Sequence, residues 1–102
     1  MVAPRPLSAS VLICTFNRAE LLRETLDSLR TLSSVRPWSV VVVDNNSTDW
    51  TRTVVQEAAA TFPVALAYVF EPRQGKSYAL NTGLDHSDGD VILFTDDDVR
   101  VS

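Results

Sequence analysis

An apolar run that ends in three carboxylates lies near the C-terminal end of the chain. It reads Val91-Ile92-Leu93-Phe94-Thr95-Asp96-Asp97-Asp98. Turn-forming residues precede the run, which predicts a short strand buried on both faces. Three adjacent carboxylates repel one another, and a hard divalent cation such as Mg²⁺ or Mn²⁺ compensates such a group. Ligands of open α/β sheets lie beyond the carboxyl ends of the strands. We therefore expect a metal site here, with an exposed acidic turn as the alternative.

The rest of the chain alternates between apolar runs and segments with helical spacing. The predicted strands before this one are 9–15, 40–43 and 64–70, and the predicted helices are about 18–32, 50–62 and 76–86. Asn17 and Glu20 form a capping-box pattern at the start of the first helix. The alternation predicts an α/β, Rossmann-like fold with four mainly parallel strands and helices on both faces. We take 1–7 as a leader and 8–102 as one domain.

Composition excludes several classes of protein. The formal net charge of −4 argues against nucleic acid as a general partner. Cys14 is the single cysteine, so an internal disulfide is excluded and a reducing compartment is favoured. The first ten residues lack the apolar segment of a signal peptide. We expect a cytoplasmic protein, with attachment to the inner face of a membrane in a longer form as the alternative.

Familiar nucleotide-binding motifs are missing. No glycine follows the first predicted strand, where a dinucleotide-binding loop needs several and a nucleotidyltransferase needs a glycine-rich basic loop. The leading glycine of a Walker A loop would fall on Phe70. Arg100 occupies the position that a D-x-D phosphatase motif gives to threonine or valine. The sequence therefore disfavours these four classes.

Three polar residues in the loops remain candidates for binding a nucleotide. Asp44 ends the second predicted strand, where it can accept a hydrogen bond from a ribose or a base; a helix cap is the alternative. Arg73 and Lys76 lie near the start of the third predicted helix, where they can offer positive charge to a diphosphate. Ordinary solvated charge is the alternative for both.

Taken together, four segments resemble the N-terminal half of a family 2 glycosyltransferase with the GT-A fold. They are residues 11–18 (VLICTFNR), 41–49 (VVVDNNSTD), 75–84 (GKSYALNTGL) and 89–98 (GDVILFTDDD). The resemblance covers residues 8 to 100 and rests on the order and spacing of the four segments. It implies a domain that binds a nucleotide-diphospho-sugar donor, with a UDP- or GDP-sugar favoured.

The resemblance also implies roles for residues near the first two strands. Thr15 and Asn17 would lie against the nucleotide, with Arg18 nearby. Asp44 would form a hydrogen bond with the base, which is usually uracil, another pyrimidine or guanine. These roles are expectations from the family and not from the spacing of the residues.

Later in the chain, the resemblance implies contacts to the diphosphate and the metal. Arg73 and Lys76 fall in the segment that contacts the base or the diphosphate. Asp96 and Asp98 match the outer positions of the D-x-D motif. Asp96 would face the ribose or the metal, and Asp98 would ligate Mg²⁺ or Mn²⁺. Asp97 can exchange roles with Asp98, since the run of three leaves the register open.

The chemistry implied is inverting glycosyl transfer to an unidentified acceptor. In this family a separate carboxylate acts as the general base on the acceptor hydroxyl. No residue here is assigned that role, because the expected acceptor half does not follow the D-x-D motif. We therefore expect a donor-binding half that binds a nucleotide with a metal, transfers no sugar alone and self-associates through its open sheet. The alternative is a non-catalytic interaction module with a structural acidic edge.

Overall fold

The computed structural model describes residues 7–32 and 37–95, which form four strands and three helices in alternation. The strands are β1 (Ala9–Thr15), β2 (Trp38–Asp44), β3 (Leu66–Phe70) and β4 (Val91–Thr95). The helices are α1 (Ala19–Leu29), α2 (Thr51–Thr61) and α3 (Lys76–Asp85). The predicted α/β alternation is confirmed, and the predicted bounds differ only at the ends of elements. The third strand, for example, begins at Leu66 instead of residue 64.

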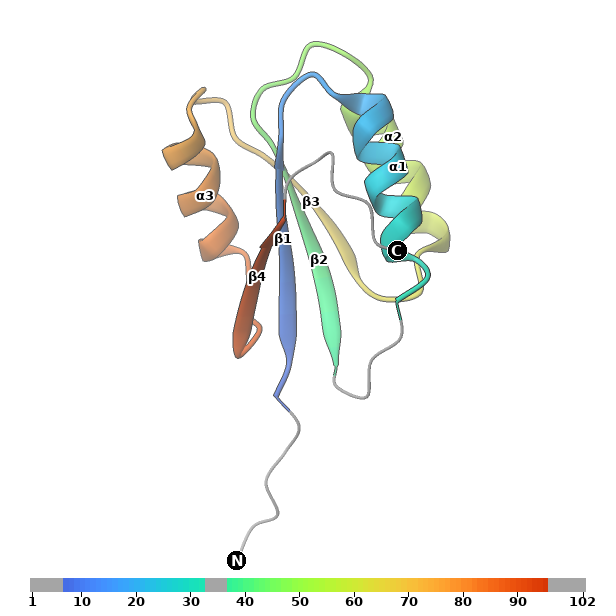
Figure 1. Cartoon of the computed structure of the whole chain (residues 1–102). Helices are drawn as coiled ribbons and strands as arrows, with labels where there is room; N and C mark the ends of the chain where they lie inside the picture. The colour runs from blue at the N-terminus through green and yellow to red at the C-terminus, as the bar shows by residue number, and fades with distance from the viewer. Residues whose placement is uncertain (1–6, 33–36, 96–102) are drawn as a thin grey trace, which may run out of the picture.

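All strand pairs in the sheet are parallel, and the strand order is β3-β2-β1-β4. β1 is central: Val11 lies opposite Val40 of β2 on one side and opposite Leu93 of β4 on the other. The chain moves outward from β1 through β2 to β3 and then returns to add β4 on the other side of β1 (Figure 1). The gap between the carboxyl ends of β1 and β4 is therefore the point at which the winding direction reverses, where such sheets bind ligands.

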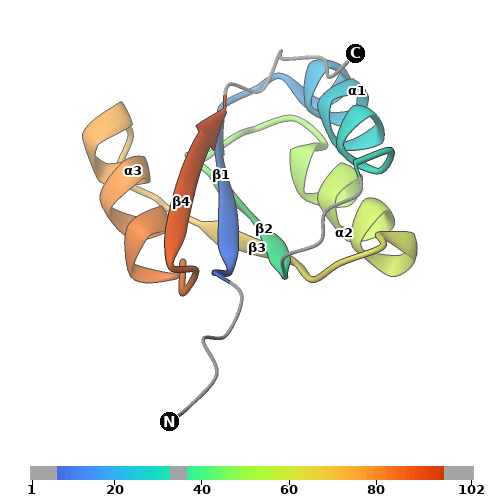
Figure 2. The same ribbon diagram turned by 60° about the horizontal axis from the view of Figure 1, so that its bottom comes forward.

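The helices cover both faces of the sheet, as Figure 2 shows: α1 and α2 lie on one face and α3 on the other. The larger core lies under α1 and α2 and includes Ile13, Leu26 and Val55. The smaller core lies under α3, where a Cβ added to Gly83 would clash with the side chain of Leu12. With 11, 11 and 10 residues, none of the helices in the described ranges is long enough to cross a bilayer.

The prediction that the fourth strand is buried on both faces is wrong. Within the described part of the chain, β4 is an edge strand that pairs with β1 alone. Leu93 and Phe94 are 52% and 58% exposed, respectively. An apolar run identifies a strand but not its place in the sheet, and among the described residues α3 covers this side of the sheet only in part. The burial of β4 was therefore decided by strand order, which local pattern does not encode.

The predicted capping box at the start of α1 is also wrong. Asn17 has a left-handed backbone (φ 50°), and Arg18 is the N-cap residue without a side-chain cap. The Asn17 carboxamide oxygen instead accepts hydrogen bonds from the backbone N–H groups of Thr48 and Asp49, at 2.7 and 3.3 Å. Asn17 thus holds the loop after β2 and does not cap its own helix.

Asp49 supplies the missing cap from the neighbouring loop. Its Oδ2 accepts the N–H of Ala19 in α1, and its Oδ1 accepts the N–H of Thr51 in α2. Burial alone would raise the pKa of Asp49, but hydrogen bonds from the Thr51 hydroxyl and from backbone N–H groups outweigh it, so the pKa is lowered. One carboxylate therefore fixes the starts of both helices and the distance between the loops after β1 and β2.

Candidate functional site

An open cavity of about 910 Å³ lies at the carboxyl ends of β1 and β4, on the side of the sheet that carries α3. Its floor is apolar and comes from β1, α3 and β4, and its rim is polar and comes from the loops after β1, β2 and β3. The lining residues are Leu12, Cys14, Thr15, Phe16, Arg18, Asn45, Gln74, Gly75, Lys76, Ala79, Leu80, Phe94 and Thr95. This combination of an apolar floor and a few converging polar groups is typical of small-molecule sites.

Three of the residues expected to bind a nucleotide line this cavity. Thr15 ends β1 and is 3% exposed, and its carbonyl oxygen accepts the N–H of Asn45 at 2.9 Å. Arg18 follows in the turn before α1, and Lys76 is the first residue of α3. The two cations come from different connections of the sheet: Arg18 follows β1, and Lys76 follows β3. The cavity therefore has positive charge at its rim above an apolar floor.

Asp44 and Asn17 lie beside the cavity, and neither lines it. Asp44 is 2% exposed; its Oδ2 accepts the hydroxyl of Tyr68 at 2.6 Å, and its Oδ1 accepts the N–H of Ser47 at 2.9 Å. Partial burial and then the hydrogen bond to Asp44 raise the pKa of the Tyr68 hydroxyl. The alternative interpretation, a helix cap, does not describe Asp44, because its bond to Ser47 lies within the loop and α2 begins only at Thr51, with Trp50 as the N-cap residue.

Asn45 joins two of the loops that form the rim, and the sequence analysis did not identify it. Its Nδ2 donates to the carbonyl oxygens of Glu71 and Arg73, at 3.2 and 2.7 Å, and its Oδ1 accepts the N–H of Gly75 at 3.0 Å. All the hydrogen-bonding capacity of the carboxamide except one lone pair is thereby used. The only sequence signal was an amide residue directly after a strand, which is also common in plain turns.

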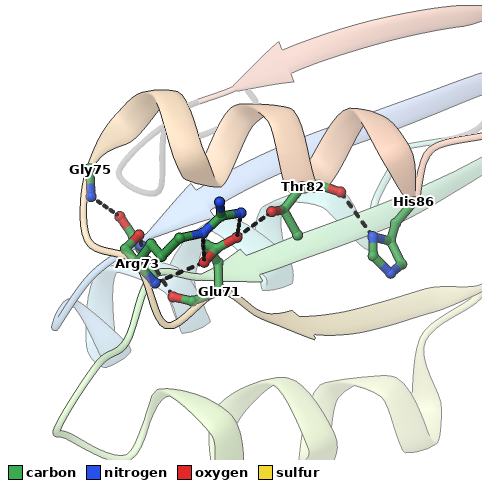
Figure 3. Close-up of polar contacts among 6 residues, drawn as sticks. Glu71, Arg73, Gly75, Thr82 and His86 are labelled. Carbon is green, nitrogen blue, oxygen red and sulfur yellow. Dashed lines mark hydrogen bonds and ion pairs between the residues drawn. The ribbon is translucent and has the colours of Figure 1, made fainter.

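Buried Glu71 forms an ion pair with the largely exposed Arg73 at the start of the loop between β3 and α3 (Figure 3). Arg73 Nε and Nη2 donate to the two carboxylate oxygens of Glu71 at 3.1 and 3.0 Å, and the Arg73 N–H adds a third bond at 2.8 Å. The hydroxyl of Thr82 donates the fourth. Side-chain hydrogen bonds from Arg73 and Thr82, with the Arg73 N–H, lower the pKa of Glu71 to about 2.

Arg73 is therefore committed to Glu71 and does not line the cavity. Its guanidinium also lies over the ring of Tyr78, 4.6 Å from the centroid. The hydrogen bond with Glu71 raises the pKa of Arg73 above its ordinary value. Both side chains are therefore ionised at neutral pH, and their two charges cancel. Of the two cations predicted after β3, Lys76 is the one that lines the cavity.

This cluster predicts a loss of stability in acid. The pKa of Glu71 falls from its usual 4.5 in the unfolded chain to about 2 in the folded one. Between these values the unfolded state binds more protons, so the free energy of unfolding should decrease as the pH falls from about 4.5 towards 2. Urea unfolding across this range should show the decrease in the wild type and a flatter profile in Glu71→Gln, which is also less stable at pH 7.

Glu57→Gln is the matched control for this measurement. Glu57 pairs with Arg23 at 3.9 Å on the surface of α2, and its side chain is 67% exposed. Such pairs contribute little, so the profile of Glu57→Gln should follow the wild type. Parallel profiles for the wild type and Glu71→Gln would contradict the assignment of the acid transition to Glu71.

The predicted metal ligands, Asp96 and Asp98, and their neighbour Asp97 lie outside the described residues. β4 leads directly to them, and its last residue, Thr95, lines the cavity. Within residues 7–32 and 37–95, no group of three His, Cys, Asp or Glu side chains is arranged to hold a metal ion. The expected metal ligation therefore stays a prediction.

The family model described as glycosyl transferase family 2 matches residues 10–102. Among curated proteins, the succinoglycan biosynthesis protein ExoM of Rhizobium meliloti is 37% identical over 92 residues, which is 88% of this chain and 29% of ExoM. Among solved structures, the mannosyltransferase PcManGT of Pyrobaculum calidifontis, in complex with GDP-Man and Mn²⁺, has a TM-score of 0.85 at 39% identity. That match covers 97% of this chain and 30% of the solved one.

A second solved structure, S. aureus TarS 1-349 in complex with UDP, has a TM-score of 0.78 at 28% identity. That match covers 90% of this chain and 28% of the TarS chain. The chain thus spans about a quarter to a third of the length of the proteins it matches. These comparisons support the GT-A arrangement that the resemblance implied and concern the N-terminal part of that arrangement.

Proposed function

The chain belongs to glycosyl transferase family 2, and we propose that it binds the nucleotide-diphospho-sugar donor in a metal-dependent, inverting transfer of a sugar. The single observation that carries the proposal is the cavity at the reversal point between β1 and β4, with Thr15, Arg18 and Lys76 at its rim. That is the place where open α/β sheets bind nucleotides. Solved relatives with GDP-Man, UDP and UDP-GlcNAc support the choice of ligand class.

In this proposal the rim binds the diphosphate and the base. Arg18 and Lys76 supply positive charge to the diphosphate, and the N-terminus of α3, which has no side-chain cap, adds its unpaired N–H groups. Thr15 and Asn17 contact the nucleotide from the loop after β1. Asp44 offers the base a remaining carboxylate lone pair. Arg73 acts indirectly in this proposal, because its guanidinium is bound to Glu71 beside the cavity.

A divalent cation fits the donor set that follows β4. Asp96 and Asp98, with Asp97 as the alternative partner, provide the hard oxygen ligands that Mg²⁺ and Mn²⁺ prefer. When bound, the cation supplies Lewis-acid stabilisation of the charge that develops on the leaving nucleoside diphosphate. Mn²⁺ in the PcManGT complex supports this choice. The protein's own part is to hold the donor in a fixed orientation over an apolar floor.

Calorimetry tests the proposal directly. Titration with UDP and with GDP, each with and without Mn²⁺, should give metal-dependent binding by the wild type. Asp98→Ala should weaken that binding at least tenfold, which corresponds to about 1.4 kcal/mol. Asp85→Asn, an exposed carboxylate at the far end of α3, should bind as the wild type does. No binding of either nucleotide, or equal heats for wild type and Asp98→Ala, would favour the non-catalytic module instead.

A further inference from the structure

We propose that Glu71 is a positioning residue for the donor: it holds the loop between β3 and α3 in the one conformation that presents Gln74, Gly75 and Lys76 to the cavity. The inference rests on the proposed function for its ligand, but its structural part stands on contacts within the chain. Nothing in the resemblance assigned a role to Glu71. It lies outside the cavity and acts through the loop that lines it.

Glu71 is buried and fully paired within the described chain. Its side chain is 4% exposed, and its two oxygens accept four hydrogen bonds, three from Arg73 and one from Thr82. A buried carboxylate costs several kcal/mol unless it is paired in this way. The cost is met by one partner within the loop, Arg73, and one in α3, Thr82, so the pairing and the loop conformation depend on each other.

The partners tie the loop to the helix that follows it. Arg73 lies two residues after Glu71 in the loop, whereas Thr82 lies in the second turn of α3 (Figure 3). The same carboxylate therefore fixes the start of the loop against the body of α3. Between these points the chain passes through Gly75, whose φ of 141° and ψ of 138° belong to a region that only glycine populates readily.

This conformation places the lining groups. Gln74, Gly75 and Lys76 follow the ion pair directly and form the part of the rim that the loop after β3 and the first residue of α3 contribute. If the ligand had to order the loop, each residue that it fixed would weaken binding through lost conformational entropy. One such residue is worth about tenfold in affinity. Glu71 removes this cost in advance, because it orders the loop before the donor binds.

The experiment measures loop order and affinity separately in the 102-residue chain. Amide hydrogen exchange of Arg73 and Gly75 reports the loop without a ligand, and calorimetry with UDP and with GDP in the presence of Mn²⁺ reports binding. In Glu71→Gln, which keeps the shape but loses the ion pair, we expect both amides to exchange at least tenfold faster and the affinity to fall about tenfold. Thr82→Val, which removes one hydroxyl, should shift both readouts less in the same direction and serves if Glu71→Gln does not fold.

Val55→Ala is the control for a merely structural effect. Val55 is buried in the core under α1 and α2, on the other face of the sheet. The variant should lose stability yet keep wild-type affinity and wild-type exchange at Arg73 and Gly75 under native conditions. Unchanged exchange in Glu71→Gln, or faster exchange with unchanged affinity, would overturn the inference. If the wild type binds neither nucleotide, the proposed function fails, and the positioning role for the donor fails with it whatever the exchange shows.

Discussion

Asn45→Ala should lower the free energy of unfolding by about 3 kcal/mol and the Tm by roughly 10–20 °C. The substitution leaves the carbonyl oxygens of Glu71 and Arg73 and the N–H of Gly75 without their partner. Each buried polar group that loses its hydrogen bond costs about 1–3 kcal/mol. The total sits at the lower end of that sum because water reaches two of the three groups, which are only partly buried. Thermal and urea unfolding measure the loss.

The neighbouring residue offers a matched control. Asn46 donates one long hydrogen bond, 3.3 Å to the carbonyl oxygen of Pro72, and has a φ of 65°. Glycine accepts that backbone conformation, so Asn46→Gly removes the side chain without introducing strain. We expect a loss below about 1 kcal/mol. Equal losses in the two variants would show that the junction between these loops does not depend on the Asn45 carboxamide.

The strands and helices were predictable because their signals are local. Four consecutive valines, 40–43, bounded by polar residues, identify β2 whatever surrounds it. Alternation of such runs with helical segments then indicates a parallel sheet, since parallel neighbours need a crossover connection, which is usually a helix. The place of the cavity at the carboxyl ends of the strands follows from the same rule. Thr15 reaches it because it ends β1, Arg18 because it lies in the turn after β1, and Lys76 because it begins the helix that follows β3.

The parts that were missed depend on contacts between distant segments. Asn17 and Glu20 match a capping box, yet Asp49 supplies the cap of α1 from 30 residues away. Asn45 was overlooked because its partners come from the loop after β3, and Glu71 because one of its partners, Thr82, comes from a helix. A single sequence records which residues can form hydrogen bonds, but the choice of partner depends on the assembled fold. Side-chain positions at a site are therefore harder to predict than the strands that carry them.

The exposure of β4 shows that a local pattern does not determine the burial of apolar residues either. The second large effect concerns an apolar residue that is buried. Leu26→Ala should lower the free energy of unfolding by about 2–5 kcal/mol. Leu26 is a fully buried residue of α1, in the core that covers one face of the sheet. Truncating it removes apolar contact and leaves a cavity that the packed neighbours fill only in part. The midpoint of urea unfolding, at unchanged m-value, measures this loss.

Leu93→Ala is the comparison that decides whether the β4 side is open in solution. Leu93 is 52% exposed, so its truncation should cost about 1 kcal/mol or less, since a fully buried leucine is worth about 1.5–3 kcal/mol. A loss as large as that of Leu26→Ala would mean that something covers Leu93 in solution. The expected self-association can be recognised from its dependence on protein concentration. If a second copy of the chain covers Leu93, the unfolding midpoint rises with protein concentration. A midpoint that is independent of concentration, together with a small loss for Leu93→Ala, would mean that the edge strand stays open.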